Sequence, residues 1–150
     1  GRIKVSRRKS RILAFQALFS WEASESSLED LLTFSWNYKD SNVLEQAPAL
    51  ESEVAKDEKL FASLLVSGTI NNITEIDKLI TEHLTDNWSF DRINKVALAI
   101  LRVSIYELKF QSDSVAKIVI DEAVNIAKQF GADDSYKFIN AILDKLGNND

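Results

Sequence analysis

The side chains that could support catalysis are few and scattered. The chain has one histidine, His83, and no cysteine, so a nucleophile–base pair or a thiolate metal site cannot be assembled. Its four glycines, at 1, 68, 131 and 147, are too far apart to form a phosphate-binding loop. Adjacent acids such as Asp121 and Glu122 diverge on a helix and cannot easily share a substrate proton. We therefore expect no catalytic residue, no metal site, no cofactor and no enzymatic activity.

Positive charge is concentrated at the N-terminus. Residues 1–11 contain no acid and six basic residues: Arg2, Lys4, Arg7, Arg8, Lys9 and Arg11. The remaining 139 residues contain 12 basic and 23 acidic residues, a net charge of −11. A basic arm on an acidic body is typical of a nucleic-acid contact placed at one end of a protein. The alternative is a basic terminus that only improves solubility.

A second group of residues has the types that unpaired RNA requires. Phe130 ends one predicted helix beside Gly131, Phe138 lies just across the turn with Tyr136, and Arg102 sits on the preceding helix. Aromatic rings and arginines supply the base stacking and phosphate contacts of single-strand binding. The alternative is that Phe130 and Phe138 are core residues at helical spacing.

The elements that must position these residues are predicted to be helices. One proline and four glycines are too few for a turn-rich β protein, and apolar residues recur at helical spacing. Helices are expected over about 6–22, 27–36, 52–84 with a break near 69–72, 89–110, 114–130 and 135–146, with a loop over 39–56. This is an all-α chain of six or seven helices, read as one domain of residues 1–150 with a basic arm at about 1–11.

Small and polar residues mark the expected helix ends. The expected N-caps are Ser26 or Ser27, Ser89, Ser114 and the group Asp133, Asp134 and Ser135. Gly131 is expected to end its helix in the left-handed conformation, which glycine adopts without penalty. Gly68, on an apolar helix face, predicts a close helix approach. No apolar run of about 18 residues occurs, so we expect no transmembrane helix and a cytoplasmic location.

An ordered set of motifs over nearly the whole chain resembles the NusB family of bacterial transcription antitermination factors. The motifs are Arg7-Arg8 with Arg11, QALFSW at 16–21, Leu101-Arg102 with YEL at 106–108, IDEAV at 120–124, FGADDS at 130–135 and KFIN at 137–140. The resemblance implies an all-helical fold of two packed helical bundles. It also implies an RNA-binding factor rather than an enzyme.

The resemblance further implies partners and contact residues. Family members bind the single-stranded boxA element of ribosomal RNA transcripts, usually together with NusE, a small-subunit ribosomal protein, and the complex joins RNA polymerase and suppresses termination. By this resemblance the residues at RNA-contacting positions are Arg7, Arg8, Lys9, Arg11, Arg102, Phe130, Asp134 and Phe138. Phe19 falls near the NusE-facing surface. Some members also form homodimers that cover the RNA surface, and the sequence leaves this open.

Two other functions are compatible with the sequence. One is a helical protein–protein adaptor whose basic arm is incidental. The other is the helical N-terminal module of a ribosomal RNA cytosine methyltransferase, which resembles NusB. That enzyme also needs a glycine-rich cofactor loop and a cysteine nucleophile, and this sequence has neither.

Overall fold

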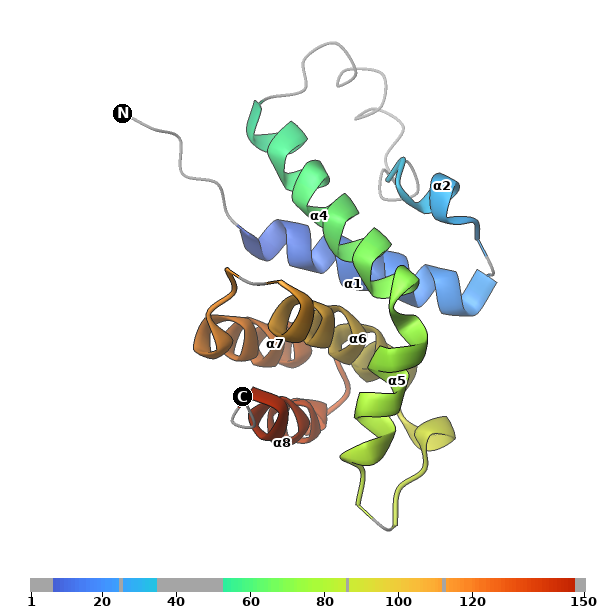
Figure 1. The fold of residues 1–150 in the computed structure, drawn as a ribbon, viewed down its shortest axis with the longest axis vertical. Coiled ribbons are helices and arrows are strands. Elements are labelled where there is room, and N and C mark those ends of the chain that lie inside the picture. The colour runs from blue at the N-terminus through green and yellow to red at the C-terminus, as the bar shows by residue number, and fades with distance from the viewer. Residues whose placement is uncertain (1–6, 25, 35–52, 86, 112, 148–150) are drawn as a thin grey trace. The chain divides into compact units, whose positions relative to one another are not determined.

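A computed structural model describes residues 7–24, 26–34, 53–85, 87–111 and 113–147 (Figure 1). The elements are α1 (Arg7–Ser24), α2 (Leu28–Leu31), α4 (Glu53–Asn71), α5 (Ile73–Glu82), the 3-10 turn η2 (Phe90–Arg92), α6 (Lys95–Phe110), α7 (Ala116–Phe130) and α8 (Ser135–Gly147). The predicted all-α class with six or seven helices is confirmed for these ranges. Among the described helices, none has the length and hydropathy that a membrane span requires.

The chain separates into two compact units, one ending at Ser67 and the other beginning at Gly68. This agrees with the two helical bundles that the family resemblance implies. The boundary falls inside α4, and a break in helix geometry follows it at Asn72, between α4 and α5. The Asn72 side chain donates a 2.8 Å hydrogen bond to the Gly68 carbonyl, so it occupies a backbone acceptor at the end of α4. The predicted break near 69–72 is therefore confirmed.

In the first unit, α1 buries three small residues together with the larger Phe15 and Leu18. Ser10, Ala14 and Ala17 are fully buried, and the Ser10 hydroxyl donates a 2.8 Å hydrogen bond to the Glu58 carbonyl on α4. This bond satisfies a buried polar side chain and fixes α1 against α4.

The second helix of this unit is shorter than predicted. Ser27 caps it as expected, accepting a 3.1 Å hydrogen bond from the Asp30 amide. However, α2 ends at Leu31, and Phe34 adopts a left-handed conformation with φ 55° while its side chain is buried. A left-handed residue cannot continue the helix, so the predicted extension toward 36 is wrong at this point. Of the predicted loop over 39–56, residues 53–56 are helical, and 39–52 lie outside the described residues.

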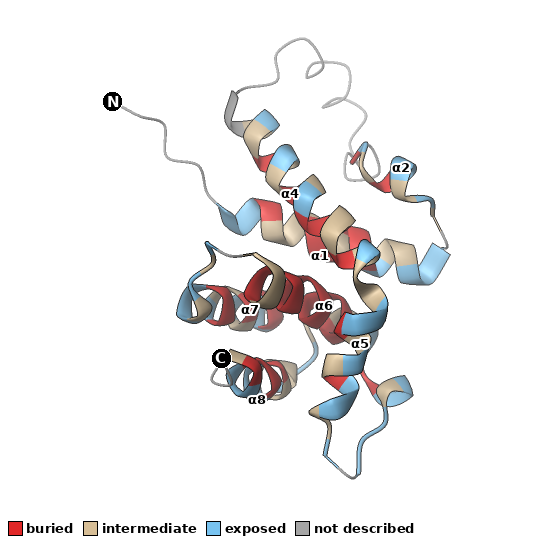
Figure 2. Ribbon diagram, viewed as in Figure 1, coloured by how far each residue is buried: buried red, intermediate tan, exposed pale blue. Residues whose placement is uncertain are grey.

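In the second unit, α6 is the central helix. Every residue from Ala97 to Leu108 is buried, as Figure 2 shows. Helix α5 packs on α6, and α7 and α8 pack on α6 and on each other. A helix that is buried on all sides is expected to be mostly apolar, which agrees with its valine, leucine, isoleucine and alanine content. Arg102, Ser104 and Glu107 are the buried polar exceptions.

Two predicted caps in this unit are wrong. Asn94, not Ser89, caps α6, accepting hydrogen bonds from the amides of Val96 at 3.0 Å and Ala97 at 3.2 Å. The Ser114 hydroxyl donates to the Gln111 carbonyl at 2.9 Å, and Val115 occupies the N-cap position of α7. Ser89 lies five residues before Asn94, and Ser114 lies one residue before Val115. Both serines therefore stand close enough to the helix start that the sequence spacing alone could not distinguish them from the residue at the N-cap position.

Gly68 allows α4 to approach α6 closely, as predicted. A Cβ atom at this position would overlap the ring of Tyr106. That ring stacks on Phe110 with centroids 5.7 Å apart, and its hydroxyl accepts a 2.9 Å hydrogen bond from Gln111. Because its face is stacked on Phe110 and its hydroxyl is hydrogen-bonded, moving the Tyr106 ring aside would cost free energy.

We expect Gly68→Ala to lower the free energy of unfolding by about 1–3 kcal/mol, because overpacking outweighs the helix propensity of alanine. Urea unfolding followed by circular dichroism measures this. Gly147→Ala is the matched control: its Cβ would lie 3.3 Å from the flexible end of Ile120, so stability should change by less than about 1 kcal/mol. Equal stability of the two variants would contradict the close approach.

Candidate nucleic-acid interface

The turn between α7 and α8 carries several of the predicted site residues. Gly131 follows α7, and its amide donates to the Ala127 carbonyl at 2.8 Å. Its φ of −89° and ψ of 171° are extended, so the predicted left-handed conformation is wrong. Glycine is needed here for space, because a Cβ atom would lie 2.5 Å from the Ser135 hydroxyl and 2.7 Å from the Ala127 carbonyl oxygen.

The left-handed residue of this turn is Asp134, with φ 67°. Its carboxylate is exposed and lies 3.6 Å from the Lys137 ammonium. The Ser135 hydroxyl is buried and has no hydrogen-bond partner among the described residues, so the prediction that Ser135 caps α8 is wrong. Asp133 is exposed. The turn therefore presents two carboxylates to solvent beside the start of α8.

Aromatic rings flank this turn. Phe130, at the end of α7, is 38% exposed, and the Lys128 ammonium lies 4.8 Å from the centroid of Tyr136. Phe138 is half-buried, and its ring centroid lies 5.5 Å from that of Trp88. Trp88 is 47% exposed and was not among the predicted site residues. The available signal was a large aromatic residue among polar neighbours in a predicted turn, where exposed aromatic residues usually serve binding.

Arg102 is placed differently from the other predicted contacts. It is 4% exposed, and its guanidinium donates to both oxygens of Asp77, from Nε at 2.9 Å and from Nη2 at 2.8 Å. The guanidinium also lies 5.7 Å from the centroid of the Phe90 ring. This bidentate pair joins α6 to α5. Direct RNA contact by Arg102 stays a prediction, and it requires the pair to open.

The basic N-terminal residues that the structure describes form the first turns of α1. Arg7, Arg8 and Lys9 are exposed. Arg7 pairs with Asp57 at 3.3 Å, and its guanidinium lies 4.1 Å from the centroid of the Phe61 ring on α4. The part of the basic arm formed by residues 1–6 lies outside the described residues. From residue 7 onward the predicted arm is therefore a helix.

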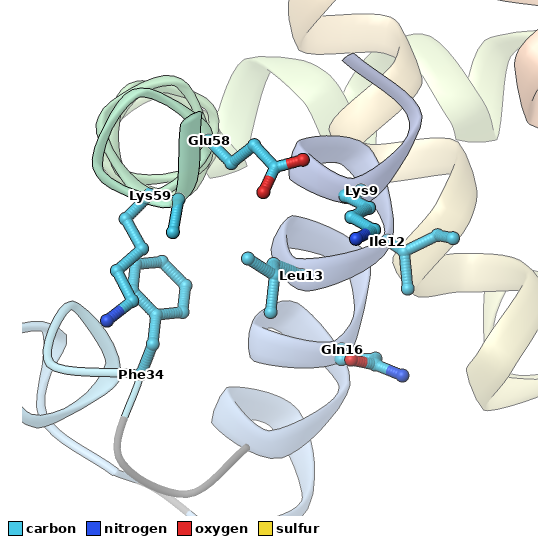
Figure 3. Close-up of a pocket in the computed structure, with 8 residues that line it drawn as sticks. Lys9, Ile12, Leu13, Gln16, Phe34, Glu58 and Lys59 are labelled. Carbon is cyan, nitrogen blue, oxygen red and sulfur yellow. The ribbon is translucent and has the colours of Figure 1, made fainter. Parts of the chain in front are cut away.

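Beside this basic turn, α1 and α4 enclose a cavity of about 400 Å³. Its lining residues are Lys9, Ile12, Leu13, Gln16, Phe34, Ala55, Glu58 and Lys59 (Figure 3). Four of the lining residues are apolar, while the two lysines and the Glu58 carboxylate supply the charge. Further along α1, Phe19 is 39% exposed, so the residue predicted to face NusE lies at the surface.

The lone histidine, His83, places Nδ1 2.8 Å from the Leu79 carbonyl oxygen one turn earlier in its helix. Among the described ranges, no three histidine, aspartate or glutamate side chains gather as a metal site would need. The predicted RNA contacts thus fall into two groups. Arg7, Arg8, Lys9 and Arg11 belong to the first unit, and Arg102, Phe130, Asp134 and Phe138 belong to the second.

Comparison with known proteins gives consistent results. The model of the NusB family matches residues 8–148. The transcription antitermination protein NusB of Treponema denticola is 52% identical over 97% of this chain and 98% of its own length. That of Treponema pallidum (strain Nichols) is 42% identical over 95% of this chain and 93% of its own.

Solved structures agree. The structure of T. maritima NusB superposes with a TM-score of 0.77 at 33% identity, covering 98% of this chain and 94% of that one. A structure of the antitermination factors NusB and NusE in complex with dsRNA matches with a TM-score of 0.74 at 26% identity. It covers 94% of this chain and 95% of the matched chain.

The geometry of Arg102 yields a stability prediction. We expect Asp77→Ala to lower the free energy of unfolding by about 2–4 kcal/mol, because it leaves a buried guanidinium without its carboxylate. Adding Arg102→Leu should restore part of the loss, since an apolar side chain needs no partner.

The control is Asp121→Ala, which removes a 3.3 Å pair with Lys117 whose side chains are 61% and 83% exposed. This change should cost at most about 0.5 kcal/mol. Chemical denaturation of all four proteins measures the differences. A small loss for Asp77→Ala, equal to that of Asp121→Ala, would show that the Arg102–Asp77 pair is not structural.

Proposed function

Because the chain belongs to the NusB family, we propose that it is an RNA-binding transcription antitermination factor that acts together with NusE. The observation that carries this proposal is the match to the family over residues 8–148. The relatives are named transcription antitermination proteins, and a related NusB was solved with NusE and double-stranded RNA. These names favour an antitermination factor over a methyltransferase module, and none denotes an enzyme.

We propose the single-stranded boxA element of ribosomal RNA transcripts as the RNA and the RNA polymerase antitermination complex as the destination. The two units would act as one RNA-binding domain in the cytoplasm. The charge distribution supports this mode of binding. Residues 12–150 carry a net charge of −11 and repel RNA, whereas the start of α1 attracts it. The strongly localised positive charge therefore orients the RNA before specific contacts form.

The predicted contact residues have two different tasks in this proposal. Arg7, Arg8, Lys9 and Arg11 bind phosphates, which supplies affinity but no sequence information. Phe130 and Phe138 supply stacking to unpaired bases. Each phosphate contact on a single strand contributes about −0.7 to the slope of log affinity against log salt. A few such contacts give moderate affinity, so additional basic surface from NusE would extend the contact and strengthen it.

A second candidate function, a helical protein–protein adaptor without specific RNA binding, has one observation in its favour. In the first unit, Leu60 is 70% exposed and Leu64 43% exposed, one turn apart on α4, and Phe19 is 39% exposed on α1. Adjoining exposed apolar residues are typical of protein interfaces, and Leu60 and Leu64 adjoin one another because residues four apart share a helix face. They fit NusE binding, with Phe19 at the contact, and they fit a second copy in a homodimer. They also fit an adaptor without specific RNA binding.

The proposed function is tested by titrating a labelled boxA RNA with and without NusE over a salt series. A scrambled RNA of equal length is the control. We expect preferential binding to boxA that strengthens with NusE and weakens steeply with salt, because phosphate contacts release counterions. Equal, weak binding to both RNAs would leave only charge attraction and favour the adaptor.

Charge removal separates the two candidates further. Lys9→Gln and Arg8→Gln together should flatten the salt slope by about 1.4, if both residues contact phosphates. Lys145→Gln, an exposed lysine on α8, should leave it unchanged. NusE binding is also measured without RNA. If the protein is an adaptor, the charge-removal variant should still bind NusE, and the salt slopes of RNA binding should not differ between the variants.

The exposed carboxylate at the α7–α8 turn gives a prediction of opposite sign. We expect Asp134→Asn to tighten RNA binding about two- to fivefold at low salt, because it removes a negative charge beside the RNA and leaves Lys137 unpaired. Asparagine also tolerates the left-handed conformation of this position. Asp144→Asn on α8 is the control. Unchanged or weaker binding by a folded Asp134→Asn protein would refute the repulsion.

A further inference from the structure

Trp88 lies in the connection between α5 and α6 and is not among the contact residues of the proposed function. Its indole is 47% exposed. One side of it packs on Phe138, with centroids 5.5 Å apart and ring planes inclined by 34°. A large ring that is half-covered by a second ring and half-open to water is placed to accept a third.

The connection that carries Trp88 is held in place on both sides. The Trp88 amide donates to the Thr85 carbonyl at 3.0 Å, and the Arg92 amide donates to the Ser89 carbonyl at 3.0 Å. Within the second of these turns, the Phe90 ring lies 5.7 Å from the Arg102 guanidinium. Because Arg102 is itself fixed by two hydrogen bonds to Asp77, Phe90 rests on a rigid support. A connection held in this way loses little conformational entropy when a ligand stacks on Trp88.

The charges along the neighbouring chain suit a nucleic acid. Arg92 and Lys137 are both exposed. Arg92 follows Trp88 by four residues, and Lys137 precedes Phe138 by one. Asp91 is exposed in the same 3-10 turn, and Lys137 is 3.6 Å from Asp134. An exposed pair of this kind is weak and exchanges readily with a phosphate. Cations beside exposed rings are the combination that single-stranded nucleic acid requires.

We propose that Trp88 and Phe138 form one stacking platform for an unpaired base of the RNA, with Arg102 as a positioning residue that acts through Phe90. This rests on the proposed function and adds Trp88 to the contact set. It also gives Arg102 a role that its burial permits: Asp77 fixes Arg102, and Arg102 supports Phe90, which lies in the same connection as Trp88. The platform belongs entirely to the second unit.

The test uses single-stranded RNA with 2-aminopurine at successive positions, because this base loses fluorescence when it stacks on an aromatic ring. The full-length protein is compared with Trp88→Leu, which keeps apolar contact with Phe138 but has no flat ring, and with Trp88→Phe. We expect one position to be quenched by wild type and by Trp88→Phe, and not by Trp88→Leu. Affinity of Trp88→Leu should fall at least about fivefold with an unchanged salt slope. Ile118→Ala, a truncation of another exposed apolar residue of this unit, should bind as wild type.

The positioning role of Arg102 has its own readout. Arg102→Leu combined with Asp77→Ala removes the support together with the carboxylate that pairs with it. It should weaken quenching at the same position while retaining the phosphate-dependent salt slope. Circular dichroism confirms that each variant is folded.

Three outcomes would overturn the platform, and they differ in whether the proposed function survives. Preferential boxA binding by wild type, with Trp88→Leu equal to it in affinity and quenching, refutes the platform alone. Loss of NusE binding without RNA in Trp88→Leu, with RNA binding unchanged, assigns the surface to a protein partner instead. Absence of preferential RNA binding by wild type refutes the proposed function itself.

Discussion

The burial of α6 on all sides is the constraint on which the second unit depends. Every position from 97 to 108 is buried, and three of them, Arg102, Ser104 and Glu107, are polar or charged. A charge can be buried only with a partner, because removing it from water costs far more than a neighbouring apolar contact returns. Asp77 supplies that partner for Arg102 with two hydrogen bonds. The ion pair therefore fixes where α5 packs, and with it the connection that carries Phe90 and Trp88.

The turn between α7 and α8 combines backbone strain with a buried polar group that has no described partner. Asp134 adopts a left-handed conformation, which costs a non-glycine residue about 1 kcal/mol. The buried Ser135 hydroxyl lacks a partner among the described residues. Gly131 is required because any side chain would strike Ser135 and the end of α7. The tight turn that results brings Phe138 toward Trp88 and leaves Phe130 exposed. Strain of this kind is expected where geometry serves binding more than stability.

The start of α1 in the first unit places basic residues at the helix end where the helix dipole disfavours positive charge. The first turn contains no acid, although the helix dipole favours negative charge at this end. The cost is partly offset within the unit, where Arg7 pairs with Asp57 and packs over Phe61. Retaining several cations at an unfavourable helix end is consistent with phosphate binding. In the proposed function, charge for the RNA thus comes from the first unit and the aromatic rings from the second.

The sequence by itself determined the helices and the approximate positions of most of their ends. Apolar spacing of three and four residues identified α1, α4, α6, α7 and α8, and local chemistry located the Ser27 cap and the break at Asn72. These features depend on residues within a few positions of one another, whereas the close approach at Gly68 is made with Tyr106, 38 residues away. The family motifs likewise identified the function class, because their order along the chain is itself a sequence property.

Only the tertiary structure decided the environment of each site residue. Arg102 follows Leu101 on a helix, and nothing local distinguishes an exposed arginine there from one buried against Asp77, 25 residues earlier. The contact of Trp88 with Phe138, and the extended rather than left-handed Gly131, also depend on how separate helices pack. Hydrogen-bond geometry within one turn is set by adjacent residues, whereas burial and ion pairing depend on residues that only the packed fold brings together.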